Sequence, residues 1–305
     1  MVKDFGGGSL AIGAYRLPSR LEPKNYLMAT TNLLAGKRGV IFGALDDQSI
    51  AWHIAEVCAA QGATFTLTNA PVALRFGSIK ELAEKFGAEV IPADATSIED
   101  LENLFQRSEE LLGGKLDFVC HAVGMSLNVR KGKPYTDLKH DWMLKTFDIS
   151  AISFHKMCQV LYKGDHMADW GSILGLTYIA AQRTFPDYSE MAESKALLES
   201  FARSFGYHFG EKNHVRVNTV SQSPTMTTAG KGVKGFQEFF GYADDMSPLG
   251  NAPAWACAEY CATLFSDFTR YVTMQNLFHD GGFSNMGMNP KLIKVAEEDS
   301  KGGAL

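Results

Sequence analysis

The stretch GKRGVIFGALDDQSIAWHIA, residues 36–55, decides the fold. A short apolar, β-branched run ends at Gly43, and six residues later Ser49 stands where a helix is expected to begin. The apolar residues that follow it recur at helical spacing, on Ile50, Ala51, Ile54 and Ala55. A glycine turn lets a backbone approach phosphate groups, and a helix N-terminus presents free N–H groups to them. We therefore expect a dinucleotide pyrophosphate to lie against Gly43, Ser49 and Ile50.

This turn departs from the usual GxGxxG pattern. Ala44 and Leu45 follow Gly43, and His53 stands where a third glycine is expected. On this segment alone, an ordinary turn between a strand and a helix remains an open alternative.

Outward from this turn, β-branched runs alternate with amphipathic segments, the pattern of repeated strand–helix units around a parallel sheet. Strands are predicted at 39–43, 64–69, 89–94, 116–123, 171–178, 215–221 and 273–282, and helices at 49–61, 78–86, 98–112, 141–162, 187–208 and 254–266. Ser49 and Ser97 are the predicted N-caps of the first and third helices. The prediction is a single α/β domain over residues 34–288 with a doubly wound, seven-stranded, Rossmann-type parallel sheet, a flexible leader at 1–33 and a C-terminal tail at 289–305.

Composition narrows the class of protein. The 305 residues carry a formal net charge of −5, which gives no reason to expect nucleic acid or an anionic membrane as a partner of the whole surface. We find no apolar run of the roughly 18 residues that span a bilayer and no secretory pattern, so we expect a cytoplasmic protein. Five cysteines without CxxC pairs predict buried, reduced thiols and no metal site.

Three further positions fit a nucleotide. Asn69 ends the second predicted strand, where a carboxylate usually marks NAD preference; with Arg75 six residues on, NADH is expected and NADPH stays possible. Asp94 and Ala95 follow the third strand and are placed to contact adenine, although a turn or capping role for Asp94 is an equal alternative. Val123 and Gly124 end the fourth strand in HAVG, where a glycine would admit nicotinamide or substrate, or be a plain loop glycine.

The chemistry is expected from Tyr178, Tyr188 and Lys195. Seven residues separate Tyr188 from Lys195, nearly two turns if both lie on one helix, so both side chains could face one cofactor. A tyrosine beside an ammonium suits proton donation, because the cation favours negative charge on oxygen. The spacing is also common by chance, and either tyrosine could be a core aromatic.

Together these motifs resemble the short-chain dehydrogenase/reductase superfamily and, within it, the enoyl-acyl-carrier-protein reductases of bacterial type II fatty acid synthesis. The resemblance rests on SIAWHIA (49–55), HAVG (121–124), the two tyrosines with Lys195, VRVNTVSQSPTMT (215–227) and FHDGGF (278–283), and it spans about residues 34–288. It implies reduction of a trans-2-enoyl thioester by hydride transfer from NAD(P)H to C3. The rival ketoreductases use Tyr-x3-Lys, but Met191 stands four residues before Lys195.

The resemblance also implies roles for individual residues. Thr225 and Thr227 would border the nicotinamide with Pro224, and residues 226–243 would form a substrate lid. Met125 and Tyr178 would contact substrate, and Phe236 and Phe239 would line an acyl tunnel, unless they are ordinary helix core.

The resemblance implies two partners as well. These are an acidic acyl carrier protein, docking near Lys231 and Lys234, and three further copies of the chain in a homotetramer. In this sequence SQSP replaces the commoner SAGP, so Gln222 and Ser223 enter a loop beside the nicotinamide. Gln237 and Glu238 stand where the family has basic residues.

Overall fold

The computed structural model describes residues 31–231, 235–290, 292 and 293. Most of the predicted leader and tail, and Lys234 of the predicted lid, lie outside the described residues. Within them, seven parallel strands form one sheet in the order β3-β2-β1-β4-β5-β6-β7, which confirms the predicted fold class. The strands are β1 (Arg38–Phe42), β2 (Thr64–Thr68), β3 (Glu89–Val90), β4 (Leu116–His121), β5 (Met167–Thr177), β6 (Arg216–Gln222) and β7 (Asn276–His279).

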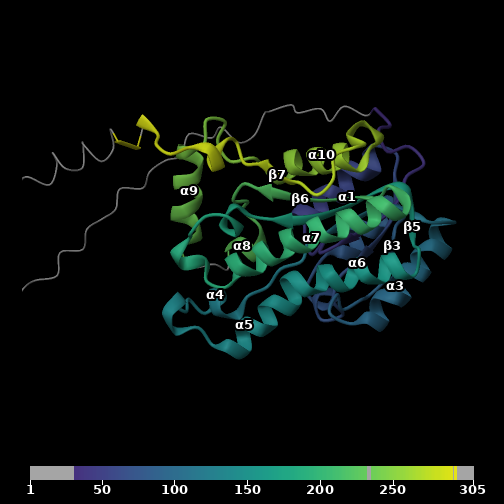
Figure 1. The fold of residues 1–305 in the computed structure, drawn as a ribbon, viewed down its shortest axis with the longest axis horizontal. Coiled ribbons are helices and arrows are strands. Elements are labelled where there is room, and N and C mark those ends of the chain that lie inside the picture. The colour runs from purple at the N-terminus through teal and green to yellow at the C-terminus, as the bar shows by residue number, and fades with distance from the viewer. Residues whose placement is uncertain (1–30, 232–234, 291, 294–305) are drawn as a thin grey trace, which may run out of the picture.

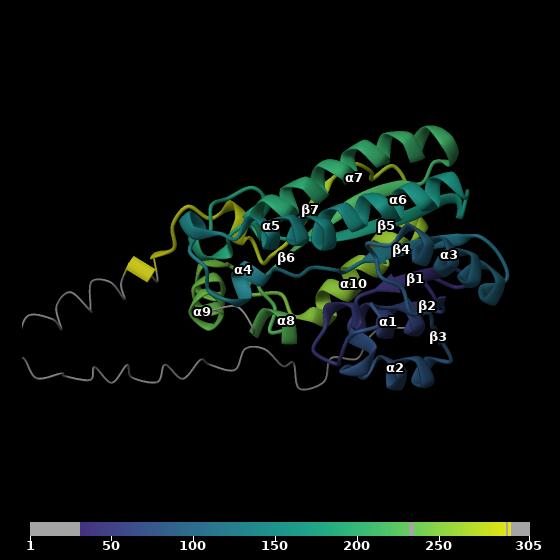
Figure 2. The same cartoon turned by 90° about the horizontal axis from the view of Figure 1, so that it is seen from below.

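Helices cover both faces of this sheet (Figures 1 and 2). One face packs against α1 (Ile50–Ala60), α2 (Ile79–Phe86) and α10 (Ala254–Phe265), and the other against α3 (Ile98–Leu112), α6 (Ser153–Lys163) and α7 (Met191–Asn213). Each face has its own apolar core because the strands are apolar on both sides, as expected for a buried parallel sheet.

Several predicted elements differ in extent. β5 covers Met167–Thr177 where 171–178 was predicted, and β7 covers only Asn276–His279 of the predicted 273–282. β3 is assigned only to Glu89–Val90, although the Ile91 and Ala93 amides still donate to the carbonyl oxygens of Leu67 and Asn69. The predicted helix at 141–162 is a run of α5 (His140–Phe147), a π-helical turn (Asp148–Ile152) and α6. The predicted helix from 187 begins only at Met191, after a 3-10 turn at Pro186–Tyr188.

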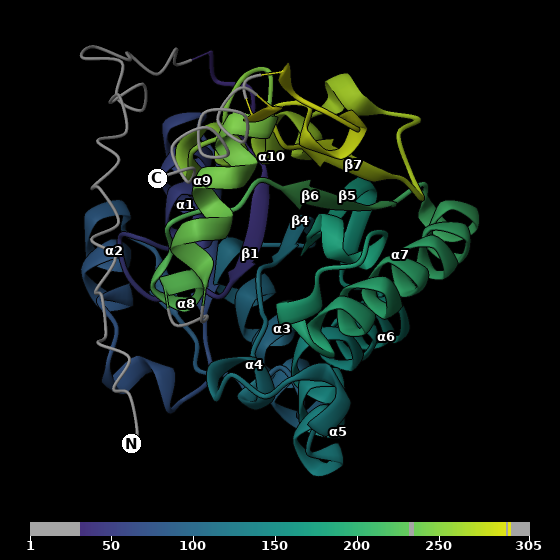
Figure 3. The same ribbon diagram turned by 90° about the vertical axis from the view of Figure 1, so that its left-hand side faces the viewer.

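Smaller helices lie at the carboxyl ends of the strands, the edge of the sheet that is turned toward the viewer in Figure 3. On one side α8 (Thr228–Lys231) and α9 (Phe236–Met246) fall within the predicted lid, and on the other α4 (Leu127–Arg130) leads into α5. The order of the strands reverses direction between β1 and β4, and ligands of doubly wound sheets bind at the carboxyl edge beside such a point. Among the described residues, no helix is long and apolar enough to cross a membrane.

Candidate active site

The turn after β1 is built for close approach of a backbone. Gly43 has a φ of 92°, and a Cβ at this position would lie 2.2 Å from the carbonyl oxygen of Ala122, so only glycine fits. Ser49 precedes α1 at the predicted N-cap position but makes no capping bond; its hydroxyl accepts from the Leu45 amide and donates to the Asp46 carbonyl oxygen. The serine thus shapes the turn and leaves the first amides of α1 free for an anion.

Two side chains predicted to contact the nucleotide hold local structure. The amide nitrogen of Asn69 donates to the Ala44 carbonyl oxygen over 3.1 Å, which ties the end of β2 to the Gly43 turn. Asp94 accepts from both the amide and the hydroxyl of Thr96, the turn role that its sequence left open. Ser97 is the predicted N-cap of α3, accepting from the Asp100 amide.

Lys195 is buried on α7 beside the end of β4. Its ammonium donates to the carbonyl oxygens of Leu176 (2.9 Å) and Val123 (3.4 Å), and burial lowers its pKa to about 8. A Cβ on Gly124 would meet the Lys195 Nζ at 3.6 Å and the Ser150 Oγ at 3.9 Å, both ordinary contact distances, so the ammonium lies directly beside this glycine. The ammonium has three donors, and these two bonds use two of them.

Tyr178 and Tyr188 meet, as the sequence predicts, but not through a shared helix with Lys195. Tyr188 lies in the 3-10 turn, and Ser189, with a φ of 46°, separates it from the start of α7 at Met191. The prediction that Tyr188 and Lys195 occupy one helix is therefore wrong, because Pro186 and the left-handed Ser189 hold this segment in a turn. The two tyrosine rings lie 5.2 Å apart between centroids.

An aromatic cluster surrounds the tyrosines. Phe185 and Phe239 pack on Tyr178 at ring-centroid distances of 5.6 and 6.2 Å, and Phe283 lies 6.4 Å from Phe185. Phe239 of α9 thus reaches the tyrosines, whereas Phe236 packs against Phe240 within the lid. Phe185 and Phe283 were not among the predicted site residues, although both occur in stretches that carried the resemblance.

The Tyr178 hydroxyl is buried without a hydrogen-bond partner in the described chain. Burial raises the pKa of Tyr178 above its ordinary value and that of Tyr188 to about 12, so both phenols stay protonated at neutral pH. Buried, protonated phenols can donate a hydrogen bond to an oxygen that gains negative charge.

The segment after β6 is braced by Gln222. Its amide nitrogen donates to the Ala252 carbonyl oxygen (2.8 Å) and to the Thr225 hydroxyl (3.3 Å), while its Oε1 accepts from the His279 Nδ1 (2.7 Å). Ser223 accepts from the Ala252 amide through its hydroxyl. Thr227 follows, its hydroxyl accepting from the Gly230 amide at the start of α8.

The lid contacts the Gly43 turn directly. The Thr228 hydroxyl of α8 donates to the Asp46 carboxylate over 2.6 Å, and Lys231 lies 3.5 Å from the Gln48 side-chain oxygen. Met125, predicted to contact substrate, is held through its backbone, whose amide donates to the Ser150 hydroxyl.

Glu190 is a buried carboxylate that sequence reasoning missed. Its Oε1 accepts from Ser126, Asn128 and Thr146, at 2.8, 3.2 and 2.7 Å, and its Oε2 has no partner in the described chain. It fastens the loop after β4 and α5 to the start of α7, two residues from Tyr188. A single glutamate after a tyrosine carries no signal of this role in the sequence.

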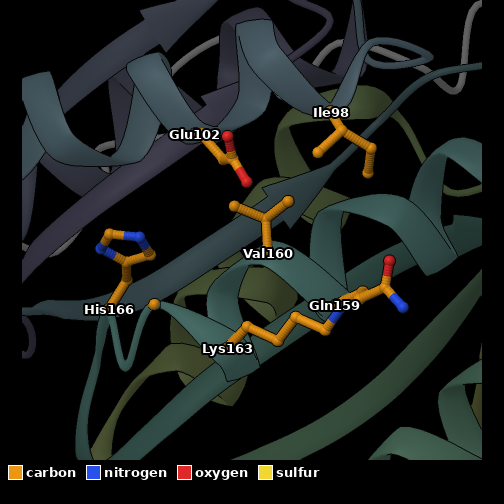
Figure 4. A pocket seen from close by; sticks show the side chains of 7 residues that line it. Ile98, Glu102, Gln159, Val160, Lys163 and His166 are labelled. Carbon is orange, nitrogen blue, oxygen red and sulfur yellow. The ribbon is translucent and has the colours of Figure 1, made fainter.

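A pocket of about 100 Å³ lies between α3 and α6, where Glu102, Lys163 and His166 are among its lining side chains (Figure 4). None of the predicted site residues lines it. All five cysteines are buried and free, and among the described residues no group of three or more His, Cys, Asp or Glu could hold a metal ion.

Comparison with known proteins places this geometry in a family. The family model described as "Enoyl-(Acyl carrier protein) reductase" matches residues 43–284. The chain belongs to the enoyl-acyl-carrier-protein reductase family. The match covers the Gly43 turn, both tyrosines, Lys195 and the segment after β6.

Individual relatives agree. The chain is 34% identical to enoyl-[acyl-carrier-protein] reductase [NADH] 1 of Rhizobium meliloti, over 85% of this chain and 94% of the relative. The crystal structure of a FabI–NADH complex from Alistipes finegoldii has a TM-score of 0.84 at 61% identity, covering 85% of this chain and 91% of that one. A Bacillus cereus enoyl-acyl carrier protein reductase solved with NADP+ and indole naphthyridinone has a TM-score of 0.78 at 29% identity, covering 84% and 99%.

Proposed function

We propose that this protein reduces the trans-2 double bond of an enoyl thioester carried by acyl carrier protein, with NADH as hydride donor. The observation that carries the proposal is the close approach of the Tyr178 and Tyr188 rings at the carboxyl edge of the sheet, where the buried Tyr178 hydroxyl has no partner in the described chain. The Lys195 ammonium donates to the carbonyl oxygen of Leu176, two residues before Tyr178. Relatives named as NADH-dependent reductases and the neighbour solved with NADH support the choice of cofactor.

The residues at the carboxyl edge fit a dinucleotide. Gly43 leaves no Cβ in the turn after β1, the Ser49 side chain does not cap the first amides of α1, and Gly124 lies directly beside the Lys195 ammonium. We propose that Gly43, Ser49 and Ile50 hold the pyrophosphate, Asn69, Asp94 and Ala95 the adenosine half, and Val123, Gly124, Thr225 and Thr227 the nicotinamide. Bound NADH supplies the hydride that reaches C3.

We assign the proton chemistry to the protein. When C3 accepts hydride, negative charge develops on the thioester oxygen as an enolate, and C2 is protonated afterwards. Tyr188 donates a hydrogen bond to this oxygen, and the charge of Lys195 favours the enolate while its free donor holds a ribose hydroxyl. Tyr178, Met125, Phe236 and Phe239 shape the acyl site, beneath a lid at 226–243.

A ketoreductase is the nearest rival, and two positions disfavour it. The tyrosine of a Tyr-x3-Lys pair would stand at Met191, which is buried at the start of α7, and a serine thirteen residues before Tyr188 would stand at Gly175. At Gly175 a Cβ would lie 3.0 Å from Leu198 and 3.1 Å from Phe154, so the packing leaves little room for a side chain there.

The deciding experiment is a steady-state assay with crotonyl and longer enoyl thioesters, and with ketoacyl thioesters as the rival substrate. We expect oxidation of NADH by enoyl substrates only, with a higher kcat/KM for NADH than for NADPH, since Asn69 is followed by no immediate basic pair. A tenfold advantage for NADPH, about 1.4 kcal/mol, would reverse the cofactor assignment.

Assembly and location are part of the proposal. We propose a homotetramer, because the resemblance implies one and because large apolar side chains such as Phe278 of β7 and Tyr271 are exposed on the single chain. We also propose a cytoplasmic location, as expected from the sequence. Light scattering that gives a stable monomer at assay concentration would contradict the tetramer.

A further inference from the structure

The two segments on either side of the tyrosines, residues 130–139 and helix α9, carry net charges of opposite sign. Residues 130–139, RKGKPYTDLK, contain four cations and one carboxylate in a chain whose net charge is −5. Helix α9 (Phe236–Met246), which begins in the lid and ends three residues beyond it, contains three carboxylates, Glu238, Asp244 and Asp245, and no cation. Figure 3 shows α4 and α9 on opposite sides of the carboxyl edge.

The 130–139 segment is fixed next to the catalytic tyrosine. The Ser189 hydroxyl donates to the Lys133 carbonyl oxygen over 3.2 Å, and the Tyr135 hydroxyl donates to Glu193 over 2.8 Å. Both contacts join the segment to residues that flank Tyr188 at the start of α7. Its charges are therefore held at a constant distance from the reacting centre.

Two of these four cations are available to a partner. Arg130 and Lys131 are exposed, and no carboxylate of the described chain lies within ion-pair distance of either. Lys133 pairs with the exposed Asp137 over 3.3 Å, and Lys139 lies over the Trp142 ring. Exposed cations without partners attract an acidic surface at little desolvation cost.

The lid attracts an acidic partner less strongly. Glu238, Asp244 and Asp245 repel an acidic surface, and the Lys231 ammonium of α8 is directed to Gln48 of the Gly43 turn. Lys234 lies outside the described residues. Charge complementarity thus favours the 130–139 segment, which comprises the end of α4 and the loop after it.

We propose that the acidic acyl carrier protein docks on the 130–139 segment, with Arg130 and Lys131 as its main contacts, instead of on the lid helix. This inference rests on the proposed function, because it takes the carrier-bound thioester as the substrate. The segment delivers the acyl chain beside Tyr188.

The test is charge reversal read on two substrates with the same acyl chain. One is the enoyl-acyl carrier protein and the other is the enoyl N-acetylcysteamine thioester, which is uncharged. Arg130→Glu with Lys131→Glu is expected to lower kcat/KM for the carrier-bound substrate about tenfold at low salt, with a smaller loss at high salt, because a Debye length of about 10 Å at 0.1 M screens exposed charges. The uncharged thioester should be reduced within about twofold of the wild-type rate.

Two control variants localise the effect. Lys115→Glu with Lys163→Glu makes the same change of charge away from the carboxyl edge and is expected to leave both substrates unaffected. Lys231→Glu tests the lid and is expected to lower kcat/KM for the carrier-bound substrate less than the reversal at Arg130 and Lys131.

The outcomes separate the inference from the function. A wild-type enzyme that reduces neither enoyl thioester contradicts the proposed function itself. With an active wild type, a larger loss from Lys231→Glu, an equal loss on both substrates, or no loss from the double reversal would overturn docking on the 130–139 segment. Arg130→Ala with Lys131→Ala, expected to give a smaller loss of the same selectivity, provides a milder variant should the reversal reduce the yield of folded protein.

Discussion

The rings of Tyr178 and Tyr188 lie 5.2 Å apart at an interplanar angle of 57°, so both phenols face one small space. Burial raises the pKa of Tyr178 further above its ordinary value than that of Tyr188, which makes Tyr188 the better acid. We predict that Tyr188→Phe lowers kcat on the order of 100-fold with an unchanged Kd for NADH, and that Tyr178→Phe has a smaller effect. Single-turnover rates and fluorescence titration of NADH measure the two quantities.

The stability of the tyrosine variants provides an independent check. Tyr178→Phe removes a buried hydroxyl that has no partner, so its Tm should equal or exceed that of the wild type. Full activity of Tyr188→Phe together with an inactive Tyr178→Phe would exchange the two roles.

Most of the fold could be predicted because it depends on short-range patterns. The run from β1 through Gly43 to α1 combines a β-branched strand, a glycine whose positive φ other residues rarely adopt, and apolar residues at helical spacing. Each of these features is local in the sequence. The same patterns recur through the other strands, so the seven-stranded parallel sheet follows. The Tyr188 turn was missed because helical spacing continues across Pro186 and Ser189, where backbone geometry interrupts the helix.

Parts of the site depend on contacts between distant segments, which the spacing of residues does not encode. Gln222 could be placed beside the nicotinamide loop, but its bonds to Ala252 and His279 arise only when β6, β7 and α10 come together. The contact between Thr228 and Asp46 spans 182 positions of the chain. Such pairs become visible only in the folded protein.

The pKa of Lys195 predicts a pH dependence. Burial lowers this pKa from 10.5 to about 8, so between pH 8 and 10.5 the folded enzyme has lost a proton that the unfolded chain still holds. The ammonium that favours the enolate is then absent, and kcat/KM should fall above about pH 8. The stability penalty of the buried charge declines over the same interval, so unfolding free energy should rise while activity falls.

Lys195→Arg tests whether Lys195 causes the fall in kcat/KM above about pH 8, the basic limb of the pH profile. A guanidinium stays charged throughout this range. The limb near pH 8 should disappear from the residual activity of Lys195→Arg. A limb that persists there would assign the titration to another group; one near pH 12 in the wild type would point to Tyr188.

Gln222 and Ser223 give a prediction about the cofactor. Gln222→Ala removes the bonds from its side chain to Ala252, Thr225 and His279, which brace the segment that we propose borders the nicotinamide. We expect KM for NADH to rise several-fold, a net loss of about 1 kcal/mol, with a smaller change in kcat. Ser223→Ala, which loses only the bond from the Ala252 amide, is the graded control. A fall in Tm without any change in KM would reduce Gln222 to a structural role.

Glu190 predicts a contrast between two substitutions. Glu190→Ala removes the acceptor that Ser126, Asn128 and Thr146 share in a buried site. Thr146 keeps its bond to the Trp142 carbonyl oxygen, but the Ser126 hydroxyl and one amide N–H of Asn128 are left unpaired, and each buried polar group left unpaired costs about 1 to 3 kcal/mol. We expect a loss of about 3 kcal/mol or more, seen as a fall in Tm on the order of 10 °C for a domain of this size. Because the carboxylate ties the start of α7 to the loop after β4, kcat should fall as well.

Glu190→Gln keeps an oxygen acceptor of the same shape, and it exchanges only the unpaired Oε2 for an amide nitrogen. If the acceptor geometry is what matters, Glu190→Gln retains most of the Tm and kcat that Glu190→Ala loses. If instead the negative charge near Tyr188 matters, Glu190→Gln should lose kcat while its Tm stays close to that of the wild type. Differential scanning calorimetry and steady-state rates on the three proteins, measured at one pH, distinguish a positioning role for this carboxylate from an electrostatic one.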